Sequence, residues 1–107
     1  MALMLEEIMT DCNGMTESLF RQLAITSIVK YWNTNAKLVS QFGQIKPTDV
    51  YITWQCKAIE NFKALLGVSK NGDGMYFEFT LHANKNRCYL DVYHKETQVV
   101  VPLDRDV

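Results

Sequence analysis

Two histidines, each with a carboxylate close by in the sequence, are the residues of this chain that could perform acid–base chemistry. His82 follows Glu78 by four positions, and His94 follows Asp91 by three. A histidine beside a carboxylate can act as a general base. Both histidines, however, lie in segments that alternate apolar and polar residues, which indicates strands of a flat sheet. Catalysis needs a concave, partly dry site, so we interpret these pairs as surface ion pairs and expect no catalytic residue and no enzyme activity.

Cysteine is the other residue type with reactive or metal-binding chemistry, and the chain has three: Cys12, Cys56 and Cys88. Their number is odd, their spacing is wide and no CxxC pair occurs, so neither a disulfide framework nor a metal site is expected. Cys56 and Cys88 fall on predicted apolar faces, where a thiol behaves as a small hydrophobic group. The sequence has no phosphate-binding or dinucleotide-binding motif, and we expect no cofactor.

Alternating polar side chains carry the strongest functional signal. In GMYFEFTLH (74–82) and RCYLDVYH (87–94), one set of residues is apolar and requires a core, while the other is polar and aromatic. We call the sheet face that receives this second set the open face. The members expected there are Tyr51, Thr53, Gln55, Lys57, Lys63, Tyr76, Glu78, Thr80, His82, Arg87, Tyr89, Asp91 and Tyr93.

Four of the five tyrosines of the chain are in this set. Tyrosine presents a flat, amphipathic ring at low conformational cost and is enriched in protein-binding surfaces. We therefore expect a protein-binding site, and its residues are Tyr51, Tyr76, Arg87, Tyr89 and Tyr93.

Two alternatives to a protein-binding site remain open. The same rings could stack on unpaired bases, with Lys57, Lys63 and Arg87 neutralising phosphate; the acids Glu78 and Asp91 on that face disfavour this nucleic-acid interpretation. Tyrosine and threonine also have a high intrinsic preference for strands, so the open face could be exposed to water and bind no partner.

The elements that position these residues divide the chain into two parts. Residues 2–11 and 15–34 repeat apolar residues at helical spacing, and Thr16 suits the N-cap of the second helix. Residues 37–48 are expected to form a loop. From residue 49 to residue 102 the pattern is that of strands, although 55–66 fits either a helix or a hairpin, of which we prefer the hairpin.

Turn residues divide the second part into successive strands. Asn71-Gly72 and Asp73-Gly74 are strong hairpin signals, and residues 84–86 predict a second hairpin. Gln98-Val99-Val100-Val101 is expected to form a last strand. The sequence therefore predicts an α+β fold, with N-terminal helices packed on one face of a four- to five-stranded antiparallel meander.

The two patterns also predict which side chains form the core between helices and sheet. They are Phe20, Leu23, Ile28, Trp54, Phe77, Phe79, Leu90 and Val92.

Length and composition limit the class of protein. The chain has 107 residues, 48% of them hydrophobic and 21% charged, which indicates a single globular domain over 1–107, with 1–14 as an N-terminal extension. The formal net charge of −1 argues against a polycation built for duplex DNA. No segment reaches the ~20 apolar residues that span a bilayer, so no membrane partner is expected. Three widely spaced cysteines without a CxxC motif suit a reducing, cytosolic compartment.

Four blocks in order, DVYITWQCK (49–57), NFKALL (61–66), GMYFEFT (74–80) and YLDVYHK (89–95), resemble a family of small proteins encoded by phages and prophages of Gram-positive bacteria. That family is a domain of unknown function, and the resemblance covers about half of the chain. Residues 1–14 lie beyond its pattern.

The resemblance implies expression from a phage gene in the bacterial cytoplasm, and it supplies no catalytic residue. It suggests an accessory protein that binds one host or phage protein, for example in host takeover or in defence against a CRISPR nuclease. A single-stranded nucleic-acid-binding accessory of phage replication is the alternative. A symmetric homodimer, through the edge formed by 98–101 or through the tyrosines, is a further expectation.

Overall fold

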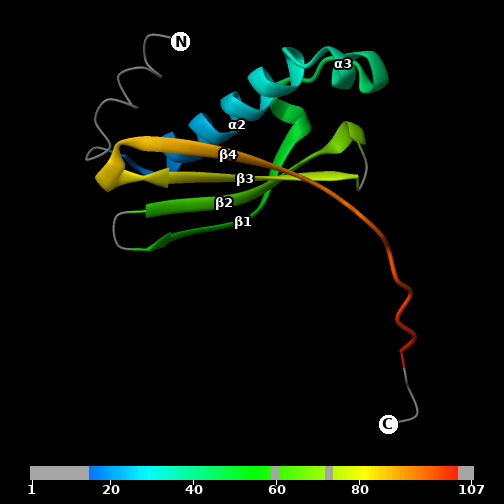
Figure 1. Ribbon diagram of the computed structural model, residues 1–107. Coiled ribbons are helices and arrows are strands. Elements are labelled where there is room, and N and C mark those ends of the chain that lie inside the picture. The colour runs from blue at the N-terminus through cyan, green and yellow to red at the C-terminus, as the bar shows by residue number, and fades with distance from the viewer. Residues whose placement is uncertain (1–14, 59–60, 72–73, 104–107) are drawn as a thin grey trace.

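Two helices cover one face of a four-stranded antiparallel sheet in the computed structural model, which describes residues 15–58, 61–71 and 74–103 (Figure 1). The expected α+β fold is thereby confirmed, with four strands. The helix expected over 2–11 and the N-terminal extension 1–14 lie outside the described residues.

Helix α2, Glu17–Asn33, begins after the expected N-cap and buries the apolar stripe that the sequence predicts. The side chain of Thr16 accepts a hydrogen bond from the backbone N–H of Leu19 at 3.1 Å, which caps the first turn. Its buried residues recur at spacings of three, one and four along a single stripe. They are Phe20, Leu23, Ala24, Ile28 and Trp32.

A second helix, α3 (Ala36–Phe42), occupies part of the segment 37–48 that was expected to be a loop, and that expectation was wrong. The side chain of Asn35 accepts hydrogen bonds from the backbone of Lys37 and Leu38, and Gly43 ends the helix at φ 83°. With seven residues and one buried side chain, α3 is too short to show a helical period.

The strands lie in the sheet in the same order in which they occur along the chain. Its strands are β1 (Val50–Ala58), β2 (Asn61–Val68), β3 (Met75–His82) and β4 (Arg87–His94), in the order β1-β2-β3-β4. The preferred hairpin over 55–66 is confirmed, because residues from both sides of it pair antiparallel. The β3–β4 connection uses Asn86 in the left-handed conformation at φ 52°, which asparagine tolerates better than most residues.

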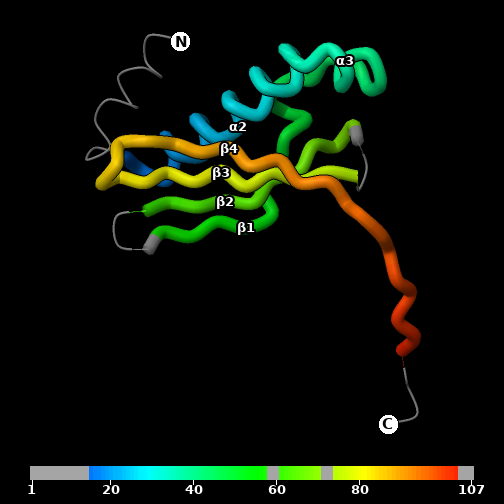
Figure 2. Tube along the Cα trace, viewed as in Figure 1, coloured from blue at the N-terminus to red at the C-terminus, as the bar shows by residue number. Residues whose placement is uncertain are grey.

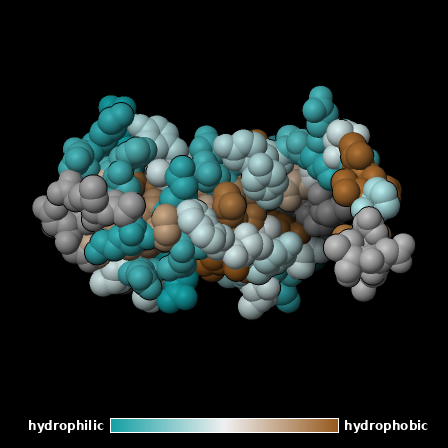
Figure 3. All heavy atoms as spheres, turned by 90° about the horizontal axis from the view of Figure 1, so that it is seen from below, coloured by the Kyte–Doolittle hydropathy of each residue, from teal (hydrophilic) through white to brown (hydrophobic). Residues whose placement is uncertain are grey.

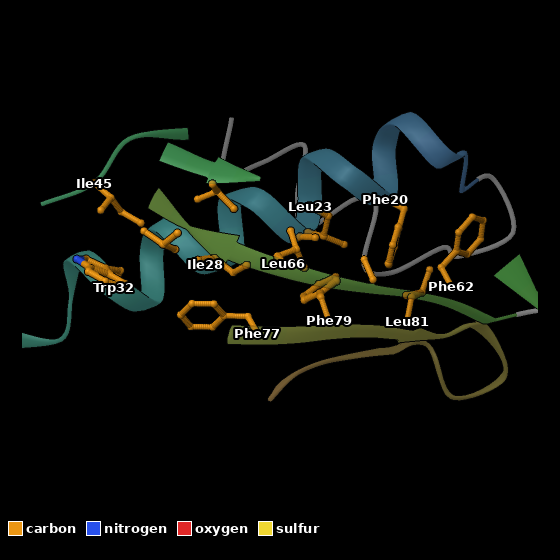
Figure 4. Packing of buried hydrophobic residues seen from close by; sticks show 14 of the residues in the cluster. Phe20, Leu23, Ile28, Trp32, Ile45, Phe62, Leu66, Phe77, Phe79 and Leu81 are labelled. Carbon is orange, nitrogen blue, oxygen red and sulfur yellow. The ribbon is translucent and has the colours of Figure 1, made fainter. Parts of the chain in front are cut away.

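The core lies between α2 and the helix-covered face of the sheet (Figure 4). Five of the residues expected there are at most 2% exposed: Phe20, Leu23, Ile28, Phe77 and Phe79. Leu90 and Val92 pack against this core but are only partly buried. Trp54 was wrongly expected in the core, since it is 47% exposed.

A β-bulge in β1 explains why Trp54 is exposed. Ile52 pairs with Leu66, but Trp54 pairs with Leu65, so Thr53 is an extra residue on β1. The side-chain hydroxyl of Thr53 donates a hydrogen bond to the Leu65 carbonyl at 3.1 Å. An extra residue moves every later side chain of the strand to the other face.

The bulge reverses four of the expected positions in β1. Trp54 and Cys56, expected on the apolar face, lie on the open face, and Cys56 is exposed. Gln55 and Lys57, expected on the open face, lie on the helix-covered face. There the Lys57 ammonium lies 5.2 Å from the centre of the Phe62 ring.

Residues 95–103 form no strand in the structure, so the expected strand at 98–101 was wrong. The backbone N–H of Lys95 still donates to the carbonyl of Gly74 at 3.0 Å, and the chain then leaves the sheet and runs away from the body of the molecule (Figure 2). An apolar run becomes a strand only where it reaches free backbone groups, and this one runs on beyond its own sheet. We call residues 95–103 the C-terminal arm.

Candidate functional site

The open face carries four rows of side chains that follow from the strand register. Each row crosses β1, β2, β3 and β4 in that order. From the end nearest the C-terminal arm, the rows are Tyr51, Gly67, Tyr76 and Tyr93; Trp54, Leu65, Glu78 and Asp91; Cys56, Lys63, Thr80 and Tyr89; and, from β2 onward, Asn61, His82 and Arg87.

Aromatic side chains concentrate in the first two rows. Five rings on this face are 38–48% exposed: Tyr51, Trp54, Tyr76, Tyr89 and Tyr93. Seen from the side away from the helices, residues of intermediate hydropathy and a few hydrophobic ones occupy the middle of the surface, with hydrophilic residues gathered to their left (Figure 3). We call these five rings, together with Leu65, the aromatic patch.

The rings of the first row are held in place before any partner binds. Tyr76 and Tyr93 are a cross-strand pair whose rings stack with centres 4.7 Å apart and planes 9° from parallel. The Tyr51 ring lies over Gly67, where an added Cβ would come within 2.5 Å of it. A glycine here lets the ring lie flat on the backbone of the neighbouring strand. Such preorganisation lowers the entropy lost on binding.

Charges on the open face are mixed and partly paired. The Lys63 ammonium lies 3.7 Å from a Glu78 carboxylate oxygen. The Glu78 carboxylate raises the pKa of Tyr93 above its ordinary value, with smaller contributions from partial burial, from Asp91 and from Tyr76. The Tyr93 hydroxyl also bonds to Glu78, and a neutral hydroxyl is the form that can donate to a carboxylate.

The histidines do not face carboxylates across the sheet. In register, His82 is opposite Arg87 and His94 is opposite Met75. The His82 ring instead meets the edge of Tyr89, with centres 5.5 Å apart. Within the described residues, no three His, Cys, Asp or Glu side chains could together hold a metal ion.

A separate hollow of about 410 Å³ lies between the helices and the ends of β3 and β4. Tyr31, Leu38, Phe42, Met75 and His94 are among the side chains that line it, and its described lining contains no carboxylate and no cysteine. His94 is therefore the one titratable group of the two sequence pairs that borders a concave site.

The residues expected to bind a protein lie on one face, whereas the three cations expected to bind nucleic acid do not. Arg87 joins the four tyrosines Tyr51, Tyr76, Tyr89 and Tyr93 on the open face, at its polar end. Of the cations Lys57, Lys63 and Arg87, Lys57 is on the opposite face and Lys63 is paired with Glu78. The cationic set is therefore split by the fold.

Sequence reasoning missed Trp54 and Leu65 as members of the open face. Trp54 lies there because of the bulge at Thr53, which no glycine or proline marks in VYITWQCKA, whereas Leu65 lies there by the ordinary alternation of β2. After Thr53, each of the two alternating sets of side chains contains a polar residue or a cysteine. This was the signal that could have indicated the change of face.

These features define a small α+β domain with one sheet face under helices and an aromatic patch on the other. Within the part of the chain that the structure describes, neither helix is long and apolar enough to cross a membrane. The chain belongs to a family of unknown function, DUF6275, which matches residues 21–103. No curated protein and no solved structure matches it.

Proposed function

We propose that the chain is a small accessory protein that acts by binding another protein through the aromatic patch, and that it is not an enzyme. The observation that carries this proposal is the gathering of five exposed aromatic rings on one uncovered sheet face, two of them stacked. Aromatic anchors on a preformed surface are typical of the centre of a protein interface.

The resemblance to phage and prophage proteins supplies the biological setting of this proposal. The partner would be a host or phage protein in the bacterial cytoplasm, and one role of this kind is interference with a defence nuclease. With a net charge of −1, the chain is not an acidic mimic of DNA. It would instead act by covering a surface of its target.

Single-stranded nucleic acid is the weaker alternative, because the cations that would contact phosphate are dispersed. Lys57 lies on the other face, and Glu78 and Asp91 occupy the centre of the aromatic patch. Nucleic-acid binding by a few exposed cations would also fall steeply as the salt concentration rises.

The test is to identify the protein that co-purifies in stoichiometric amount from nuclease-treated infected cells, and to reconstitute the complex from pure components. Tyr76→Ala with Tyr93→Ala should weaken that complex at least tenfold, since central aromatic residues dominate interface energy. Ser18→Ala with Gln22→Ala, two exposed positions on α2, should leave it unchanged. Unchanged affinity of the tyrosine variant, or salt-sensitive binding of single-stranded DNA without a protein partner, would contradict the proposal.

A further inference from the structure

The C-terminal arm combines apolar character with extreme exposure. Val99, Val100, Val101 and Leu103 are 75–83% exposed, and 97–101 carries no charge. β-branched residues in a run of this kind favour strands. The match to the family extends to residue 103, so the arm is part of the shared domain.

Strand β4, from which the arm continues, has a free outer edge and incompletely buried side chains. It is a terminal strand, and no other described strand pairs with its outer edge. None of its residues is fully buried, including Leu90 and Val92, which point to the helix-covered face. The equivalent residues of β3, Phe77 and Phe79, are at most 2% exposed. The outer edge of β4 therefore offers both backbone groups and half-covered apolar side chains.

We propose that two copies of this chain form a symmetric dimer in which each arm adds as a strand to the outer edge of β4 of the other copy. The arm has nine residues and β4 has eight, and the two are joined end to end at residues 94 and 95. A two-fold axis close to Lys95 would thus align 87–103 of one copy antiparallel with 87–103 of the other. The two four-stranded sheets become one continuous sheet.

The side chains fit this arrangement on both faces. If the pleat of β4 continues, Val100 lies on the side of Leu90 and Val92, and Val99 and Val101 lie on the side of Tyr89 and Tyr93. Pro102, which has no N–H to donate, falls near the end of the added strand, where it is tolerated.

The other free edge of the sheet is a poorer acceptor. Strand β1 contains the bulge at Thr53, and a bulge interrupts the regular spacing of backbone groups that an added strand requires. β1 is also separated from β4, and hence from the start of the arm, by two strands. A second copy at the outer edge of β4 matches the arm in length, pairs with it antiparallel and gives the complex a two-fold axis.

Sedimentation velocity of the full chain tests the dimer over concentrations on the order of 1–100 µM. The expected species has twice the chain mass of 12.3 kDa. Val99→Asp with Val101→Asp should give a monomer that keeps the helical signal of the circular dichroism spectrum, because α2 and α3 do not depend on the arm. Ser18→Asp with Gln22→Asp, which adds the same charge at exposed positions of α2, should remain dimeric. A wild-type monomer at every concentration, or a dimer that the two aspartates leave intact, would overturn the proposal.

Hydrogen exchange provides a measurement that needs no variant. The amides of Gln98 and Val100 should exchange at least a hundredfold more slowly in the wild-type dimer than in an unstructured chain. The Lys95 N–H points to Gly74 beside β3, so in a continued strand the N–H groups of even-numbered residues lie on the outer edge, where they bond to β4 of the other copy. A dimer in which these amides remain unprotected would show that the arm does not pair as a strand.

Discussion

Single residues on the open face act as a coupled set. Glu78 lies between Lys63, with which it forms an ion pair, and Tyr93, whose hydroxyl bonds to it. Tyr93 in turn stacks on Tyr76. One carboxylate in the centre of the patch thus orients a cation on one side and a ring pair on the other, which keeps the exposed rings in one arrangement.

Titration of Tyr93 should reveal this coupling. Because Glu78 raises its pKa, Tyr93 should titrate above the ordinary value of tyrosine, and Glu78→Gln should lower its pKa towards that value. Asp91→Asn should have a smaller effect in the same direction. Ring signals followed by NMR against pH would measure both, and an unshifted Tyr93 in Glu78→Gln would contradict the assignment.

The same coupling makes stability depend on alkaline pH. A folded-state pKa above the unfolded value of about 10 gives a contribution to stability that is complete below that value. It is lost as the pH rises through the folded pKa. Unfolding by urea should therefore show the wild type losing stability more steeply above pH 10 than Glu78→Gln, whereas the two should run parallel near neutrality.

At the scale of elements, regular alternation and helical spacing predicted α2 and the four strands. These patterns did not predict the local irregularities. The bulge at Thr53 reversed half of β1 without a marker residue, and α3 was too short to show a period. The arm at 95–103 has the composition of a strand, but it runs away from the free edges of its own sheet (Figure 2). Strand composition is a local property, whereas pairing depends on what lies beside the segment.

The bulge predicts a contrast between two aromatic residues. Phe79→Ala should destabilise the fold by about 3–5 kcal/mol, since it leaves a cavity in the core. Trp54→Ala should cost no more than about 1 kcal/mol, because nearly half of that side chain is already exposed. Chemical denaturation of both variants measures the difference; comparable losses would place Trp54 in the core and remove the bulge.

The cap of α3 can be tested in the same way. Asn35→Ala should cost about 1 kcal/mol, because the backbone N–H groups of Lys37 and Leu38 lose their acceptor. Asn35→Asp, which keeps that acceptor, should be close to the wild type. If alanine and aspartate behave alike, the cap does not contribute to stability.

For the molecule as a whole, the sequence predicted the layer arrangement and the tyrosines of the open face, because both depend on patterns repeated over many residues. The sequence wrongly placed Lys57 on the open face and omitted Trp54 from it. Both errors have the same cause, because the side chains of β1 change face after Thr53. A surface assembled from four strands is therefore only as predictable as the register of each strand.

A dimer joined through β4 would present two aromatic patches on one continuous sheet, and this leads to a prediction that combines both proposals. On a surface densely coated with the partner, the wild type should bind at least a hundredfold more tightly than Val99→Asp with Val101→Asp, because two linked sites give avidity. In solution, with the partner in excess, calorimetry should give both proteins the same affinity per site. Tyr76→Ala with Tyr93→Ala should instead weaken binding in both formats, since it alters the patch and leaves the arm intact. Equal surface binding by the wild type and the aspartate variant would mean that the two patches are not engaged together, even if each binds its partner.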